Sequence, residues 1–186
     1  MLNLDYPRDL VMTGAIFGVA AFVWAGWAQE QPPGQVIWRV VLGILSGAGL
    51  ALAALSIPTA IRFWHTATAI NPSGVAFKVY VGVFWAEVVI AAVLAFLASR
   101  AGRGDLIAPL IMVVVGVHFF ALAFVFDQPV LHLAAVLITA VGVVAAFLPH
   151  DTIAASFWCG VLGAPIFLAI GAWCTVAGWA ALRAPA

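Results

Sequence analysis

Long apolar stretches alternate with short polar ones along the whole chain, and this pattern decides the fold class. A helix that crosses a bilayer needs about 20 predominantly apolar residues. The breaks between the apolar stretches are short and carry prolines, glycines, amides or charges. The stretches cover residues 10–28, 36–57, 79–98, 107–126, 130–148 and 153–181. We therefore predict an all-α polytopic membrane protein: a bundle of six transmembrane helices forming a single integral membrane domain, residues 1–186.

The connections between the predicted spans differ in length. The breaks at 127–129 and 149–152 are so short that the helices they join are expected to be antiparallel neighbours. The one long connection runs over 58–78. Its stretch 62–65 favours a helix extension lying in the membrane interface, and Asn71 and Pro72 are expected to end it.

Composition supports the membrane assignment and excludes other classes. Apolar and aromatic residues make up 66% of the chain and charged residues only 8%, whereas a soluble domain has roughly a quarter of its residues charged. The net charge of zero excludes a nucleic-acid binder, and the two cysteines exclude a disulfide scaffold. The lipid bilayer is therefore the expected partner.

The termini are expected on one side of the membrane, because the predicted spans are even in number. The first span does not read as a signal peptide, since its leader carries Asp5 and Asp9 against a single Arg8. Four basic residues lie on the side of the termini and three on the other, which favours cytoplasmic termini. These residues are Arg8, Arg62, Lys78 and Arg183 on the first side, and Arg39, Arg100 and Arg103 on the second.

One charged residue lies far from the ends of the predicted helices. Of the fourteen charged residues, thirteen fall within a few residues of a predicted helix end, where water or head groups are expected to solvate them. Glu87 lies near the centre of 79–98, and His118 lies deep in 107–126. Each is eleven residues from its end of the loop that joins the two spans, roughly 16 Å along a helix. The spacing predicts that Glu87 and His118 lie at the same depth.

Two interpretations of Glu87 and His118 follow from this placement. Burial favours the neutral form of both groups, whereas mutual contact favours an ion pair, so a balanced pair can exchange a proton near neutral pH. That property suits a proton-sensitive transporter or permease-like protein. The alternative is a structural hydrogen bond between helices, worth about 0.6 kcal/mol. Tyr80, seven residues before Glu87, either extends a polar path or is an ordinary interfacial tyrosine.

No other residues predict chemistry, so we expect no enzyme activity and no catalytic, metal or cofactor site. A haem would need a second axial ligand at the depth of His118, and no histidine supplies one. Two groups of polar residues near helix ends lack metal-ligand spacing and are expected to be solvated. They are His65, His132 and Asp127 on the side of the termini, and His150, Asp151 and Glu30 on the opposite side.

The residues around His118 carry a resemblance. Residues 116–120 read Gly-Val-His-Phe-Phe and are followed by Ala-Leu-Ala. This segment resembles the Gly-x-His-Phe element in a mid-chain helix of small, multi-span bacterial membrane proteins of uncharacterised function. The resemblance implies a bacterial inner-membrane location and adds interest to His118. A second hypothesis for the function is a non-catalytic membrane subunit, packed into a homo-oligomer or a larger complex through its glycine and aromatic faces.

A short internal similarity bears on the organisation of the spans. Residues 18–25 align with 116–123, sharing Gly, Val, Phe and Ala. Three spans in each half of the chain would form an inverted repeat of the kind that transporters use. These residue types are common throughout the chain, and the remaining spans do not keep the same offset.

Overall fold

The computed structural model describes residues 2–70, 73–149 and 152–184, and they form a helical bundle without strands. Six α-helices are each long and apolar enough to cross a membrane, which confirms the predicted fold class. A short 3-10 helix, η1 (Gly104–Leu106), precedes the fourth of them. The α-helices are α1 (Pro7–Trp27), α2 (Val36–Arg62), α3 (Val75–Arg100), α4 (Ile107–Val125), α5 (Val130–Phe147) and α6 (Ala155–Arg183).

The ends of three helices differ from the expectation by three residues or more, and one of them is α3, which begins at Val75 rather than residue 79. Helix α1 begins at Pro7 rather than residue 10, because the fixed φ of a proline suits the first helical position. Helix α2 continues through Pro58 to Arg62. The expected interfacial helix extension is wrong, since residues 63–70 form turns and irregular structure that fold back toward α1. Asn71 and Pro72, expected to end that extension, lie outside the described residues.

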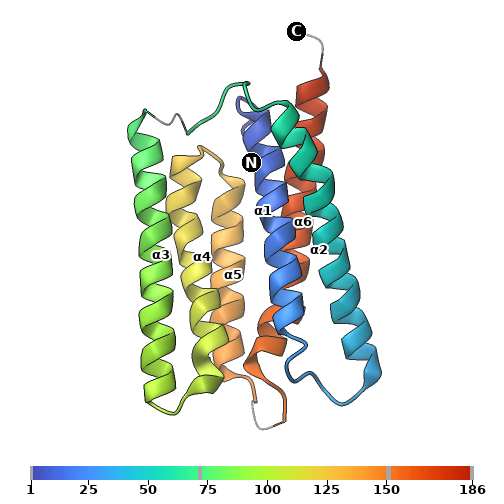
Figure 1. The fold of residues 1–186 in the computed structure, drawn as a ribbon, viewed down its shortest axis with the longest axis vertical. Coiled ribbons are helices and arrows are strands. Elements are labelled where there is room, and N and C mark those ends of the chain that lie inside the picture. Colours follow the sequence, from blue (N-terminus) through green and yellow to red (C-terminus); the bar gives the residue numbers. More distant parts are fainter. Residues whose placement is uncertain (1, 71–72, 150–151, 185–186) are drawn as a thin grey trace.

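The six helices pack as two groups of three, seen side by side in Figure 1. Helices α1, α2 and α6 form the first group, and α3, α4 and α5 form the second; α6 also contacts α4 and α5. Helix α1 begins and α6 ends at the same end of the bundle (Figure 1). Because α6 packs with α1 and α2, the groups do not follow the two halves of the chain that the internal similarity suggested.

Close approach of backbones holds the first group together. A Cβ atom on Gly18 would lie 2.7 Å from both the amide nitrogen of Ala53 and the carbonyl oxygen of Gly49 on α2. A Cβ atom on Gly178 of α6 would lie 2.6 Å from the carbonyl oxygen of Pro7 on α1. Small residues permit such contacts between membrane helices, where van der Waals packing rather than the hydrophobic effect drives association.

The two groups meet at a cluster of three phenylalanines. The ring of Phe17 on α1 makes edge contacts with Phe119 of α4 and Phe167 of α6, with ring centroids 5.2 and 5.3 Å apart. Helix α3 takes no part in this core. It packs against α4 and η1, it does not pack along α1, and Ala98 is its one buried residue among those described. The space between α1 and α3 is where the cavity described next lies.

Candidate functional site

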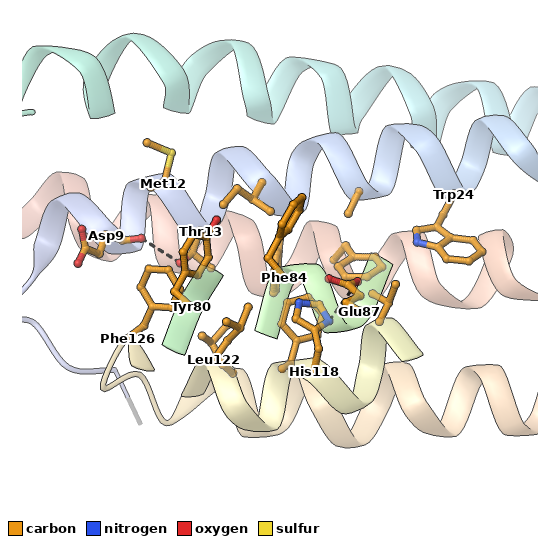
Figure 2. Close-up of a pocket in the computed structure, with 17 residues that line it drawn as sticks. Asp9, Met12, Thr13, Trp24, Tyr80, Phe84, Glu87, His118, Leu122 and Phe126 are labelled. Carbon is orange, nitrogen blue, oxygen red and sulfur yellow. Dashed lines mark hydrogen bonds and ion pairs between the residues drawn. The ribbon is translucent and has the colours of Figure 1, made fainter. Parts of the chain in front are cut away.

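A cavity of about 410 Å³ lies between α1 on one side and α3 with α4 on the other. Seventeen residues line it, and Figure 2 draws their side chains. Helix α3 contributes Tyr80, Phe84 and Glu87, spaced four and three residues apart on one helical face. Helix α4 contributes His118 and three apolar neighbours at the same kind of spacing. The regular helical period of α3 and α4 therefore builds one wall of the cavity.

Helix α1 builds the opposite wall. Its lining residues run from Asp9 near its start to Trp24 near its end. These residues are fifteen positions apart, roughly 22 Å along a helix. Figure 2 shows Asp9 at one end of the cavity, Trp24 at the other, and Glu87 and His118 between them. The cavity thus extends along most of α1. Glu87 and His118 lie in its middle part, away from both ends.

Glu87 and His118 come together in the wall of this cavity. His118 Nδ1 lies 3.3 Å from Glu87 Oε1, and their side chains are 14% and 19% exposed, respectively. The pairing lies within ion-pair distance, yet its geometry is not that of a hydrogen bond, and His118 Nδ1 has no hydrogen-bond partner among the described residues. The equal depth expected from the spacing is therefore realised as direct contact, without the hydrogen bond that the structural interpretation requires.

The surroundings of the pair are mainly aromatic. The imidazole of His118 lies against the ring of Phe119, with centroids 4.3 Å apart. Tyr80, on the same face of α3 as Glu87, lines the cavity and makes an edge contact with Phe126. Seven of the lining residues are aromatic. They are Phe17, Trp24, Tyr80, Phe84, Phe119, Phe126 and Phe167.

Sequence reasoning missed a further ionisable residue at the cavity, Asp9. It was expected to be solvated at a helix end, but it is 3% exposed and its neighbour Arg8 is 9% exposed. Arg8 Nη2 lies 2.8 Å from Asp9 Oδ1. Asp9 Oδ2 accepts hydrogen bonds from the amide of Ala69 at 2.8 Å and the hydroxyl of Thr68 at 3.0 Å. Burial results because the 63–70 connection folds over the start of α1.

The sequence offered only a weak signal for this role of Asp9. Asp9 directly precedes the predicted start of the first span, where water or head groups are expected to solvate a carboxylate, so its position alone does not indicate burial. Nothing in the order of residues indicates that a connection some sixty positions later returns to it. Arg8 strengthens the attachment, because its Nη1 donates a hydrogen bond to the carbonyl oxygen of Trp64 at 2.8 Å and its guanidinium lies over the Trp64 ring.

The other polar residues considered in the sequence do not gather into a site. No group of three His, Cys, Asp or Glu side chains within the described part of the chain could hold a metal ion. His65 is exposed, His132 lies against the rings of Phe120 and Phe124, and Asp127 accepts a hydrogen bond from Asn3. Glu30 accepts a hydrogen bond from Ser156. His150 and Asp151 lie outside the described residues.

Fold and site together define a polytopic membrane protein of six helices, with an ionisable pair facing a cavity lined largely by aromatic side chains. Comparisons of the chain with protein-family models, with curated proteins and with solved structures find no match.

Proposed function

We propose that this chain is a small proton-linked membrane transporter, in which Glu87 and His118 exchange the proton and the cavity between α1, α3 and α4 receives the transported molecule. The observation that carries the proposal is the contact of the two side chains in the cavity wall, 3.3 Å apart and without hydrogen-bond geometry. An ionised side chain at the centre of a membrane costs at least a few kcal/mol. Such residues in membrane spans mark ion and substrate pathways.

A comparison within the molecule argues against a purely structural role for the pair. Helices α2 and α6 are joined by a hydrogen bond of 3.0 Å between the buried hydroxyls of Ser56 and Thr175. Hydroxyl groups thus supply a structural polar contact in this bundle without an ionisable group. Glu87 and His118 accept a higher desolvation cost and form no hydrogen bond with each other. Their ionisable chemistry, rather than the contact itself, is the property that a transporter uses.

The test is proton movement in proteoliposomes, recorded with an entrapped pH-sensitive dye after a membrane potential is imposed. We expect proton uptake that depends on the protein and is lost in both Glu87→Gln and His118→Ala. Glu30→Gln and His65→Ala are matched controls, because they make the same chemical changes outside the cavity. Unchanged proton uptake in both Glu87→Gln and His118→Ala, with normal insertion, would overturn the proposal.

The second candidate function is a non-catalytic membrane subunit, and the packing of α3 favours it. A helix that buries only Ala98 leaves most of its surface for lipid or for another protein. Purification in a mild detergent followed by mass measurement of the intact particle discriminates the two functions. A stable hetero-complex or homo-oligomer that still assembles with Glu87→Gln, together with no proton uptake, would favour the subunit.

We further propose a bacterial inner-membrane location with cytoplasmic termini. The support is the slight excess of basic residues on the side where α1 begins and α6 ends, with Arg8, Arg62, Lys78 and Arg183 there. Fusions to alkaline phosphatase, which is active only outside the cytoplasm, test the orientation. We expect an inactive fusion after Arg183 and an active fusion at Gly102, in the turn between α3 and η1. The opposite pattern would reverse the assignment.

A further inference from the structure

The two carboxylates that line the cavity, those of Asp9 and Glu87, differ in the number of ion-pair and hydrogen-bond partners that their oxygens have. Asp9 is paired with Arg8 and accepts hydrogen bonds from Thr68 and Ala69, so both of its oxygens are engaged. Glu87 makes an ion-pair contact with His118, and within the described ranges no hydrogen bond reaches its carboxylate. A carboxylate can accept about four hydrogen bonds. Glu87 is therefore the negative group of the cavity that has acceptor capacity left for a ligand.

The charges and polar groups of the lining restrict the class of ligand. None of the lining residues is a lysine or an arginine, so an anionic ligand would meet His118 as its one source of positive charge. A sugar or a nucleotide needs many hydrogen-bonding groups, whereas this lining offers only six side chains that can form hydrogen bonds, one of which is the engaged Asp9. An inorganic divalent cation needs several oxygen ligands together. The described residues contain no group of three acidic, histidine or cysteine side chains that would supply them.

The aromatic walls favour one remaining class, organic cations with apolar substituents. The faces of aromatic rings attract cations within about 6 Å, and this attraction strengthens where water is excluded. Phe84 and Tyr80 stand on the same helix face as Glu87, and Trp24 lies at the far end of the cavity (Figure 2). The volume of about 410 Å³ lies within the range of roughly 300–1,000 Å³ that holds drug-sized molecules.

We propose that the cavity binds a monovalent hydrophobic organic cation, such as a quaternary ammonium or phosphonium ion, with the Glu87 carboxylate as its counter-charge. The proposal rests on the proposed transport function and names the substrate class of the same site. Binding exchanges one positive charge for another, because the proton shared by Glu87 and His118 leaves to solvent as the cation enters. Protons and the cation therefore compete, and affinity is expected to fall as the pH is lowered.

The titratable residues around Glu87 indicate which group holds the proton that competes with the cation. His118 faces it from α4, and Tyr80 precedes it by seven residues on α3. From α1 the one ionisable lining residue is Asp9, whose charge Arg8 balances. Neither α5 nor α6 adds a titratable residue to the lining, since their contributions are Leu131 and Phe167. The exchanged proton is thus assigned to the Glu87 and His118 pair.

The experiment measures equilibrium binding of tetraphenylphosphonium to the purified protein in a nonionic detergent. Tetraphenylborate, which has the same shape and the opposite charge, serves as the probe control. We expect saturable phosphonium binding that weakens at least tenfold in Glu87→Gln and is unchanged in Glu30→Gln, the substitution of the other glutamate in the chain. Equal binding of both probes, or equal phosphonium binding by the wild type and Glu87→Gln, would show hydrophobic partition and overturn the proposal.

Two further measurements keep the test decisive if Glu87→Gln folds poorly. Ala20→Leu adds bulk inside the cavity and leaves Glu87 and His118 in place, so it is expected to weaken phosphonium binding several-fold. In weakly buffered solution the wild type should release about one proton per bound phosphonium, read with a pH indicator. Binding without proton release would overturn the exchange.

The proteoliposome assay separates failure of this inference from failure of the proposed function. Absence of phosphonium binding while proton uptake still depends on Glu87 and His118 would reject the cation and retain the transporter. Phosphonium binding that depends on Glu87, without any proton uptake by the protein, would retain a cation-binding cavity and reject proton-linked transport.

Discussion

Helices α3 and α6 are similar in length, 26 and 29 residues, yet they relate to the rest of the molecule in opposite ways. Helix α6 buries thirteen residues, whereas α3 buries only Ala98 among the described positions. The less buried helix, α3, is nevertheless the more apolar of the two. Because lipid solvates apolar side chains as well as protein does, apolar character does not drive a membrane helix into the core.

Small residues account for the difference better than hydropathy does. Helix α6 carries four glycines that α1 or the second group approaches closely, whereas a Cβ atom on Gly82, the one glycine of α3, would meet nothing within 4 Å. The four are Gly160, Gly163, Gly171 and Gly178. Helix α6 is thus closely packed against its neighbours along its length. Helix α3 is held by α4 and by the connection attached to Asp9, so it is the wall of the cavity with the fewest packing restraints.

Among the substitutions that test this difference between α3 and α6, removing the charge of Asp9 is expected to have the largest effect on stability. Asp9→Asn leaves the buried Arg8 without its partner and weakens the attachment of the 63–70 connection. We expect a loss of about 3 kcal/mol in the free energy of unfolding, at the lower end of the cost of breaking a buried ion pair. Unfolding by SDS in mixed micelles, followed by tryptophan fluorescence, measures it. Asp5→Asn, at an exposed position, is the control; an equal loss there would contradict the assigned role.

Adding a methyl group to a glycine of each helix tests the packing directly. Gly178→Ala places a Cβ atom 2.6 Å from the Pro7 carbonyl oxygen, which belongs to backbone and cannot rotate away. We expect a loss of about 1–3 kcal/mol, the usual cost of overpacking. Gly82→Ala on α3 enters open space and should stabilise the helix by up to about 1 kcal/mol. The same SDS unfolding assay compares them, and effects of equal size would remove the distinction between the two helices.

The polar contact of α6 has a smaller expected effect. Thr175→Val removes the hydrogen bond to Ser56 and leaves its hydroxyl unpaired, which should cost about 0.6 kcal/mol, the average for such bonds in a membrane protein. The comparison is Thr139→Val on α5, where the replaced hydroxyl is buried and has no hydrogen-bond partner among the described residues. That variant should be as stable as the wild type or more stable. A loss in Thr139→Val equal to that in Thr175→Val would show a partner for Thr139.

The smallest effect on stability is expected at the contact that joins α3 to α4. Glu87→Gln keeps the shape of the side chain and removes an ionisable group that makes no hydrogen bond with His118. We expect the free energy of unfolding at neutral pH to change by less than about 0.5 kcal/mol, the ordinary range for a substitution that breaks no stabilising contact. A loss above 2 kcal/mol in the SDS assay, roughly the level of a broken buried hydrogen bond, would identify the pair as structural.

Much of the fold, and the pairing of Glu87 with His118 in the candidate site, could be predicted from the sequence. Span number and approximate limits come from local apolar composition, which needs no knowledge of packing. The matching depth of Glu87 and His118 comes from counting residues along two helices joined by a short turn. By contrast, the burial of Asp9, the grouping of α6 with α1 and α2, and the cavity itself depend on contacts between residues far apart in the chain. Neither apolar composition nor residue counts carry that information.

The place of α6 in the first group has a consequence for how the protein is made. Helices α1 and α2 leave the ribosome first and can join early through Gly18 and Gly49, but the surface of α1 around Gly14 stays uncovered until α6 is synthesised. Helices α3, α4 and α5 are threaded into the membrane during that interval. Final assembly therefore waits for the last helix, and a chain that stops before residue 155 would keep this surface of α1 open to chaperones and membrane proteases.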